Sequence, residues 1–234
     1  MKLWIVPALL VALVAAGCTG GGEDVDPDTA ADRLTAAAET LGGAERLEFS
    51  IAVDGSLPSG VRGLESAKGF GNRTPAFDGD VTIATGGTSL SAEVVSVDGT
   101  VWAKLGFSPD FFTIAPADYG APDPALLIGA PGEGIVALLA DVEVAETSQE
   151  RDGSTVLTAI TGTIPGELVA ALIPSTDPKA DVDVVVRLTA DDEVQDVTLT
   201  GAFYPDADPV TYVVTVSSST ESPTIEAPTR TGGP

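Results

Sequence analysis

The sequence predicts an α+β domain built on an antiparallel sheet. Three observations support this class: apolar residues alternate with polar ones through most of the chain, Asp-Gly turns separate several alternating segments, and only three segments have helical character. Alternation with a period of two is typical of antiparallel strands that have one covered face and one wet face. No internal repeat is evident, and the roughly 200 residues behind the export segment suffice for one domain with a substantial core.

The first 17 residues have the pattern of a bacterial lipoprotein signal peptide. Lys2 precedes an apolar run, Leu3 to Ala16, that is too short to span about 30 Å of hydrocarbon. Small residues then precede Cys18, the single cysteine of the chain, which has no disulfide partner. We expect cleavage before Cys18, its acylation (palmitate is one such group) and a flexible tether over residues 18–27; the alternative is ordinary secretion with an incidental cysteine. Acyl chains would anchor the protein on the outer face of the cell membrane without spanning it.

Three segments predict helices. Residues 28–42 repeat apolar side chains at three- and four-residue spacing and end in a glycine pair. Residues 131–140 and 165–173 both begin near a proline, whose missing N–H costs nothing in a first turn, and both are apolar enough to lie over the sheet. Residues 111–129 are rich in Pro and Ala and predict a loop.

The alternating segments predict the strands. They are 47–53, 91–97, 101–107, 142–151, 154–161, 182–188, 197–203 and 210–216. Asp98-Gly99 and Asp152-Gly153 predict two-residue hairpin turns, because both residue types tolerate positive φ. Residues 190–193 predict a longer hairpin loop. The folded domain is therefore predicted over residues 28–217, and residues 218–234 predict a disordered tail.

Composition narrows the function. A formal net charge of −24 argues against a nucleic-acid partner, since a polyanion would be repelled over the whole surface. The chain has no histidine, which removes Ser-His-Asp and Cys-His catalysis and the commonest zinc ligand. Its acidic groups lack EF-hand spacing. We therefore expect no enzyme, no metal and no cofactor, with a histidine-free glycosidase that uses paired carboxylates as the catalytic alternative.

The residue types on the apolar face leave two interpretations open. Aromatic residues make up only 5% of the chain, and the inward positions are mostly small aliphatics. Such a face fits a filled core, which composition alone favours, or a sheet and helices that enclose an apolar cavity. A lipid pocket would need no catalytic groups, because burying apolar area contributes about 25 cal/mol per Å².

Several motifs, in order and spacing, resemble the LppX/LprA/LprF/LprG family of actinobacterial lipoproteins. They are LPSGVRGL, PAFDGDVTIATGG, VSVDGTVWAKLGF, IAPADYGAPDPALLI, GEGIVALLADVE and TAITGTIPGELVAALIP. The resemblance covers nearly the full mature chain. It implies a strongly curved antiparallel sheet, an incomplete β-barrel with helices closing its concave face around a hydrophobic cavity, similar to the LolA/LolB architecture.

The same resemblance implies a function. Its members bind acylated lipids or glycolipids and help carry them across the cell envelope, in some cases beside a major-facilitator exporter. Carried over to this sequence, residues 79–87 form a strand on which Val81 borders the cavity mouth, with Ile83 next on the same face. The loop 60–74 and the loop at Tyr119 are implied to form the rim. The residues implied to cover the cavity from two helices are Ile135, Val136, Leu138, Leu139, Leu168, Val169, Leu172 and Ile173. The alternative is a non-catalytic envelope assembly lipoprotein with a filled core that docks an exporter.

Overall fold

The computed structural model describes residues 25–85, 87–130, 132–221 and 224–229. The predicted signal peptide and Cys18 lie outside these residues. In chain order the strands are β1 Arg46–Val53, β2 Gly63–Asn72, β3 Ala76–Thr85, β4 Thr88–Val97, β5 Thr100–Leu105, β6 Phe112–Ile114, β7 Glu143–Asp152, β8 Thr155–Ile164, β9 Val182–Leu188, β10 Val194–Gly201 and β11 Val210–Ser219. The helices are α1 Pro27–Gly42, α2 Pro124–Ile128 and α3 Gly166–Leu172, with 3₁₀ turns η1 Pro116–Tyr119 and η2 Ala137–Asp141.

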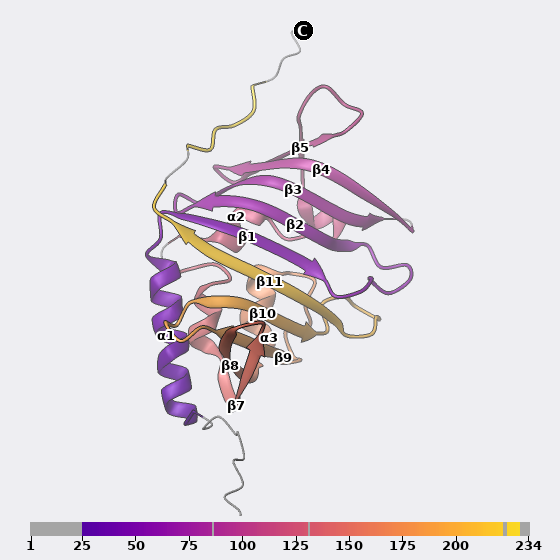
Figure 1. Ribbon diagram of the computed structural model, residues 1–234. Helices are drawn as coiled ribbons and strands as arrows, with labels where there is room; N and C mark the ends of the chain where they lie inside the picture. Colours follow the sequence, from indigo (N-terminus) through magenta and orange to yellow (C-terminus); the bar gives the residue numbers. More distant parts are fainter. Residues whose placement is uncertain (1–24, 86, 131, 222–223, 230–234) are drawn as a thin grey trace, which may run out of the picture.

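All 11 strands form one antiparallel sheet in the order β6-β5-β4-β3-β2-β1-β11-β10-β9-β8-β7 (Figure 1). The pairing of β1 with β11 joins an N-terminal half, β1–β6, to a C-terminal half, β7–β11. The edge strands β6 and β7 each pair on one side only, so the sheet does not close. The predicted α+β class with a large, incompletely closed antiparallel sheet is confirmed. Within the described part of the chain, no helix is long and apolar enough to cross a membrane.

The two predicted hairpin turns form, one of them displaced by a residue. Asp98 and Gly99 connect β4 to β5 with φ of 53° and 69°, the double positive φ of a type I′ turn. In the second hairpin Asp152 pairs with Thr155, so the loop is Gly153-Ser154 and not Asp152-Gly153. Gly153 alone carries the positive φ, 59°, which glycine adopts without steric cost.

Of the three predicted helices, the first and the third are confirmed and the second is wrong. α1 matches residues 28–42 within one residue, and α3 follows Pro165 as expected. Residues 131–140 do not form a helix; only a 3₁₀ turn at Ala137–Asp141 forms there, because Gly132 and Gly134 take φ of 80° and 75°. The predicted loop 111–129 contains β6, η1 and α2, and most of the predicted loop 60–74 is strand β2.

One hydrophobic core lies on the inner face of the sheet. Alternate residues of β1, β9 and β11 point into it, as the periodicity predicts. α1 adds Ala30, Leu34, Ala37 and Leu41, all buried at three- and four-residue spacing. Phe107, predicted to continue the inward series of residues 101–107, lies beyond the end of β5 and is exposed.

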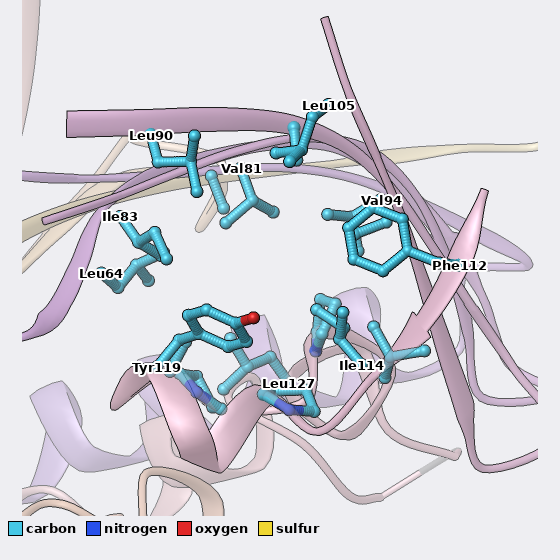
Figure 2. A pocket seen from close by; sticks show the side chains of 18 residues that line it. Leu64, Val81, Ile83, Leu90, Val94, Leu105, Phe112, Ile114, Tyr119 and Leu127 are labelled. Carbon is cyan, nitrogen blue, oxygen red and sulfur yellow. The ribbon is translucent and has the colours of Figure 1, made fainter. Parts of the chain in front are cut away.

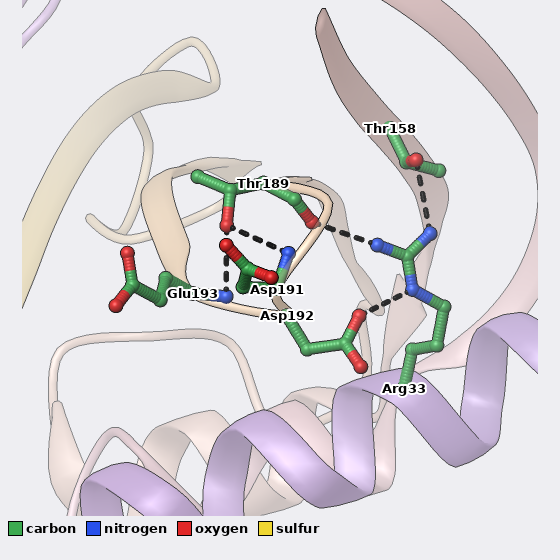
Figure 3. A network of polar contacts seen from close by, with 6 residues as sticks. All are labelled: Arg33, Thr158, Thr189, Asp191, Asp192 and Glu193. Carbon is green, nitrogen blue, oxygen red and sulfur yellow. Dashed lines mark hydrogen bonds and ion pairs between the residues drawn. The ribbon is translucent and has the colours of Figure 1, made fainter.

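A salt-bridged network fixes α1 over the C-terminal half of the sheet (Figure 3). Arg33 on α1 donates Nε–H to Asp192 Oδ1 at 2.5 Å, and its other nitrogens donate to Thr158 Oγ1 and to the carbonyl of Thr189, both at 2.9 Å. The Thr189 hydroxyl accepts from the backbone N–H groups of Asp191 and Glu193, which orders the β9–β10 turn.

Just before α1, the carbonyl of Val25 accepts from Thr147 on β7 at 2.7 Å. The N-terminal end of the domain is therefore held at the β7 edge.

The described part of the C-terminal segment packs against the sheet. β11 continues to Ser219, two residues past the predicted end of the domain. Ile225 is then buried on the outer face of the sheet with Ala76 and Val95. Phe70 and Trp102 pack around the same small cluster.

Candidate functional site

An apolar pocket lies between the inner face of β2–β5 and the segment from β6 to α2 (Figure 2). Its 18 lining residues are Leu64, Ala67, Val81, Ile83, Leu90, Ala92, Val94, Val101, Ala103, Leu105, Phe112, Ile114, Pro116, Tyr119, Ala121, Pro122, Pro124 and Leu127. Among these side chains, only Tyr119 carries a polar group, a phenol whose oxygen lies at the pocket side of the ring in Figure 2. The lining contains no carboxylate, thiol or amine, so its chemistry is that of an apolar binding site.

The pocket has a deep end and an open end. Along β4, Val94 is buried, while Ala92 and Leu90, which lie nearer to the start of the strand, are partly exposed. Along β5, Val101 and Ala103 are each 4% exposed, Leu105 is partly exposed and Phe107, just past the strand, is 82% exposed. Ile83 pairs with Leu90, and Ala92 pairs with Leu105, so these rim positions share one end of the sheet. The mouth therefore lies beside the β3–β4 turn and the β5–β6 loop.

Two small residues and one ring shape the sheet beside the pocket. Gly69 of β2 and Gly79 of β3 face each other in the ladder. A Cβ at either position would come within 2.8 Å of Cζ of Phe77, so the buried Phe77 ring lies across both glycines. Glycine at both positions lets the two strands bend together where a larger side chain would hold them apart.

A buried tyrosine pair fixes the bulge of β2 at Leu64, the residue that pairs with Ile83. The register of β2 against β3 shifts between Leu64 and Ser66, which leaves backbone groups of Leu64 outside the regular ladder. Tyr212 donates its O–H to the Leu64 carbonyl at 2.5 Å, the Leu64 N–H donates to Tyr204 at 3.0 Å, and the two hydroxyls are 2.7 Å apart. Burial raises the pKa of both phenols, so they stay neutral donors and acceptors.

Hydrogen bonds from three side chains, Ser96, Asp123 and Arg73, hold the helical wall of the pocket in place. Asp123 caps α2 by accepting from the N–H of Ala125 at 2.9 Å, and it also accepts from the Ser96 hydroxyl at 2.7 Å. At the other end of α2, Arg73 donates to the carbonyl of Ile128 at 2.9 Å. The same guanidinium donates to the carbonyls of Ala44 and Leu41 at the end of α1. Burial lowers the pKa of Arg73, which has these carbonyls as its partners.

Comparison with known proteins identifies the family. The model of the LppX_LprAFG lipoprotein family matches residues 26–223. The chain belongs to this family. A search of curated proteins by sequence finds no match.

Two solved mycobacterial structures share the fold. LprF from Mycobacterium bovis aligns with a TM-score of 0.62 and 15% identity over 88% of this chain and 99% of its own. LppX from Mycobacterium tuberculosis aligns with a TM-score of 0.57 and 15% identity over 86% of this chain and 100% of its own. At such low identity the likeness establishes the fold of this LppX_LprAFG lipoprotein and nothing finer.

The predicted site residues of the LppX_LprAFG lipoprotein fall into three places. Val81 and Ile83 line the pocket, with Val81 one step deeper than Ile83 and its partner Leu90. Ile135, Val136, Leu138 and Leu139 line a separate, smaller apolar void of about 20 Å³ against β8–β11. Leu168, Val169, Leu172 and Ile173 pack in or against the core and line neither void. The claim that helices close the concave face around a cavity stays a prediction, as do the lipid contacts of these residues.

Sequence reasoning missed much of the pocket wall. Within residues 111–129 the resemblance implied a rim position for the loop at Tyr119 only; Phe112, Ile114, Pro116 and Leu127 come from the rest of the segment that predicts a loop. Their only signal was the proline content of residues 116–124, which marks short, extended or 3₁₀ structure but does not say what it covers. Across the described ranges, no group of three or more His, Cys, Asp or Glu residues is placed to hold a metal ion.

Proposed function

We propose that this lipoprotein binds an acylated lipid or glycolipid in the apolar pocket and carries it across the cell envelope. The observation that supports the proposal is the lining itself: 18 residues from four inner strands and the β6–α2 segment, with one phenol as the only polar side-chain group. Acyl chains need no partner beyond such a surface, because each buried methylene contributes about 0.8 kcal/mol. The phenol of Tyr119 is placed to meet the polar end of a ligand.

The pocket must widen to accept a whole acyl chain. Its volume is about 90 Å³, which is room for several water-sized spheres and less than a long chain fills. The wall best able to move is β6, an edge strand of three residues paired only to β5. We infer that loading displaces β6 and η1 away from the sheet.

The anchor belongs to the same proposal. An acylated Cys18 would hold the protein at the outer face of the cell membrane, and the lipid would be exchanged there, with an exporter as a further partner. The anchor assignment predicts that Cys18→Ala abolishes acylation; a variant that stayed acylated and membrane-bound would contradict it.

The small volume of the pocket also fits a second function, that of an assembly lipoprotein. A filled-core assembly lipoprotein that docks an exporter would also have a sheet covered by short helices, and would bind no lipid. The two functions differ in whether an acyl chain enters between β3, β5 and α2.

A fluorescent fatty acid distinguishes them. Titration with cis-parinaric acid should give saturable binding, and Val81→Trp should weaken it at least about tenfold, because the indole fills the space between Ala67 and Ala92, the residues paired with Val81 on either side. Thr82→Trp, one residue along on the opposite face, is the matched control and should bind like the wild type. Equal binding by both variants, or none by the wild type, would exclude this pocket as the lipid site.

A further inference from the structure

Phe107 is the most exposed of the large hydrophobic side chains in the described part of the chain, at 82%. It lies in the β5–β6 loop, between the pocket-lining residues Leu105 and Phe112. An exposed phenylalanine forgoes the stabilisation that burial of its ring would contribute, so a bare ring at the mouth of an apolar pocket calls for a partner.

The loop holds the ring outward in a defined conformation. The N–H of Ser108 donates to the carbonyl of Leu105 at 2.8 Å, which closes a turn with Gly106 and Phe107 at its centre. The Ser108 hydroxyl donates to the Asp110 carbonyl at 3.0 Å. Phe111, after the turn, lies on the other face of the sheet, where Lys104 Nζ is 5.7 Å from its ring centre. Phe107 is therefore the exposed ring of this loop, and the half-exposed Phe112, the first residue of β6, lines the pocket.

We propose that the β5–β6 loop inserts Phe107 into a lipid bilayer and so places the pocket mouth against the membrane. This rests on the proposed lipid-binding function and adds the surface through which cargo enters. A ligand chain that crosses from bilayer to pocket through such a contact avoids exposing its methylenes to water, which is unfavourable for each of them.

Charge and tether length favour a bilayer as the occupant. The chain carries a formal net charge of −24, so anionic headgroups repel it and contact must be apolar. Residues 18–24 separate the proposed anchor from Val25 and reach at most about 25 Å, which keeps the domain beside the membrane. Val25 is held at the β7 edge of the sheet, and the pocket lies toward the opposite edge, β6. The anchor and the β5–β6 loop can therefore contact the same bilayer only if the sheet lies with its long dimension along the membrane surface.

Quenching by brominated lipid tests the insertion. The acylated protein is reconstituted in phosphatidylcholine vesicles with and without brominated acyl chains, as the Phe107→Trp variant and as the control Val156→Trp. Val156 is 39% exposed on β8, far from β5 in the strand order of the sheet. The wild type, which contains Trp102, gives the background fluorescence that is subtracted from both.

We expect bromolipid to quench the tryptophan introduced in Phe107→Trp at least about twofold more than the one introduced in Val156→Trp. Because the contact is apolar, replacing part of the phosphatidylcholine with phosphatidylglycerol should not increase the quenching. Equal quenching of both variants would overturn the insertion, whatever protein partner the loop then proved to bind.

Transfer kinetics separate this inference from the proposed function. Phe107→Ser should slow transfer of a fluorescent phospholipid between vesicles about tenfold, the factor for one lost aromatic contact, while its cis-parinaric acid titration matches the wild type. Unchanged transfer with intact binding contradicts the docking loop alone. Absence of binding in the wild type contradicts the pocket itself.

Discussion

Arg73 illustrates, at the scale of a single residue, how a cation that donates to backbone carbonyls can stabilise this acidic chain. Its guanidinium is half-buried and donates to carbonyls at the ends of α1 and α2, groups that a helix leaves unpaired. A positive charge at two helix C-termini also complements both helix dipoles. The side chain thereby connects the helix that follows the tether to the helix that forms the pocket wall.

Removing this cation should destabilise the domain. Arg73→Met keeps the aliphatic bulk but leaves several carbonyls without donors, and we expect the free energy of unfolding to fall by about 2–3 kcal/mol in a urea titration. Arg62→Met is the control: Arg62 is exposed and donates to a single carbonyl, that of Asp118, so its loss should cost less than about 0.5 kcal/mol. Equal effects of the two variants would show that Arg73 has no special role.

Asp78 is expected to make stability depend on pH. Its pKa is raised by burial first and then by the charges of Asp80 and Glu93. These three carboxylates and Glu226 line one surface groove. The folded state therefore holds the proton more tightly than the unfolded chain does, so ionisation of Asp78 costs stability as pH rises through the folded pKa. Asp78→Asn should raise Tm at neutral pH by up to about 2 °C. The difference should shrink as pH falls and the wild-type carboxyl becomes protonated in the folded state; a pH-independent difference would contradict this origin.

At the scale of elements, the facing glycines decide how β2 and β3 bend. A Cβ on Gly79 would come within 2.2 Å of the Lys68 carbonyl oxygen, a backbone atom that cannot swing aside. We expect Gly79→Val to lower the free energy of unfolding by about 3 kcal/mol or to prevent folding. Gly42→Ala is the control, since its Cβ would meet nothing within 4 Å in α1, and it should stabilise by up to about 1 kcal/mol. Chemical denaturation measures both, and a mild effect at Gly79 would mean that the strands separate easily.

Elements with a long hydrophobic pattern were predicted correctly, and the shortest elements were not. β1, β9 and β11 alternate over seven or more residues, and their strands and inward faces were correct. The predicted helix at 131–140 failed because its apolar residues have the right spacing while Gly132 and Gly134 adopt a left-handed backbone, which no hydrophobic pattern reports. β6, η1 and α2 have three to five residues each, too short for any period to show.

At the scale of the whole molecule, the pocket brings together residues that no local pattern connects. The strand side of its wall follows from alternation, and family resemblance singled out Val81 and Ile83. The other side, from Phe112 to Leu127, depends on how a proline-rich segment folds back over the sheet. That arrangement is fixed by distant contacts, such as Ser96 with Asp123 and Arg73 with Ile128, which are not visible in the sequence.

Mass spectrometry of the protein from an actinobacterial host tests lipid binding most directly. The chain from residue 19, without its anchor, is purified gently and measured under native and then denaturing conditions. We predict a stoichiometric mass excess in the native spectrum that is released on denaturation as an acylated lipid, and that is reduced in Val81→Trp but kept in Thr82→Trp. A native mass equal to that of the bare chain, with no binding of added acylated glycolipid, would contradict the carrier function and favour an assembly lipoprotein with a filled core.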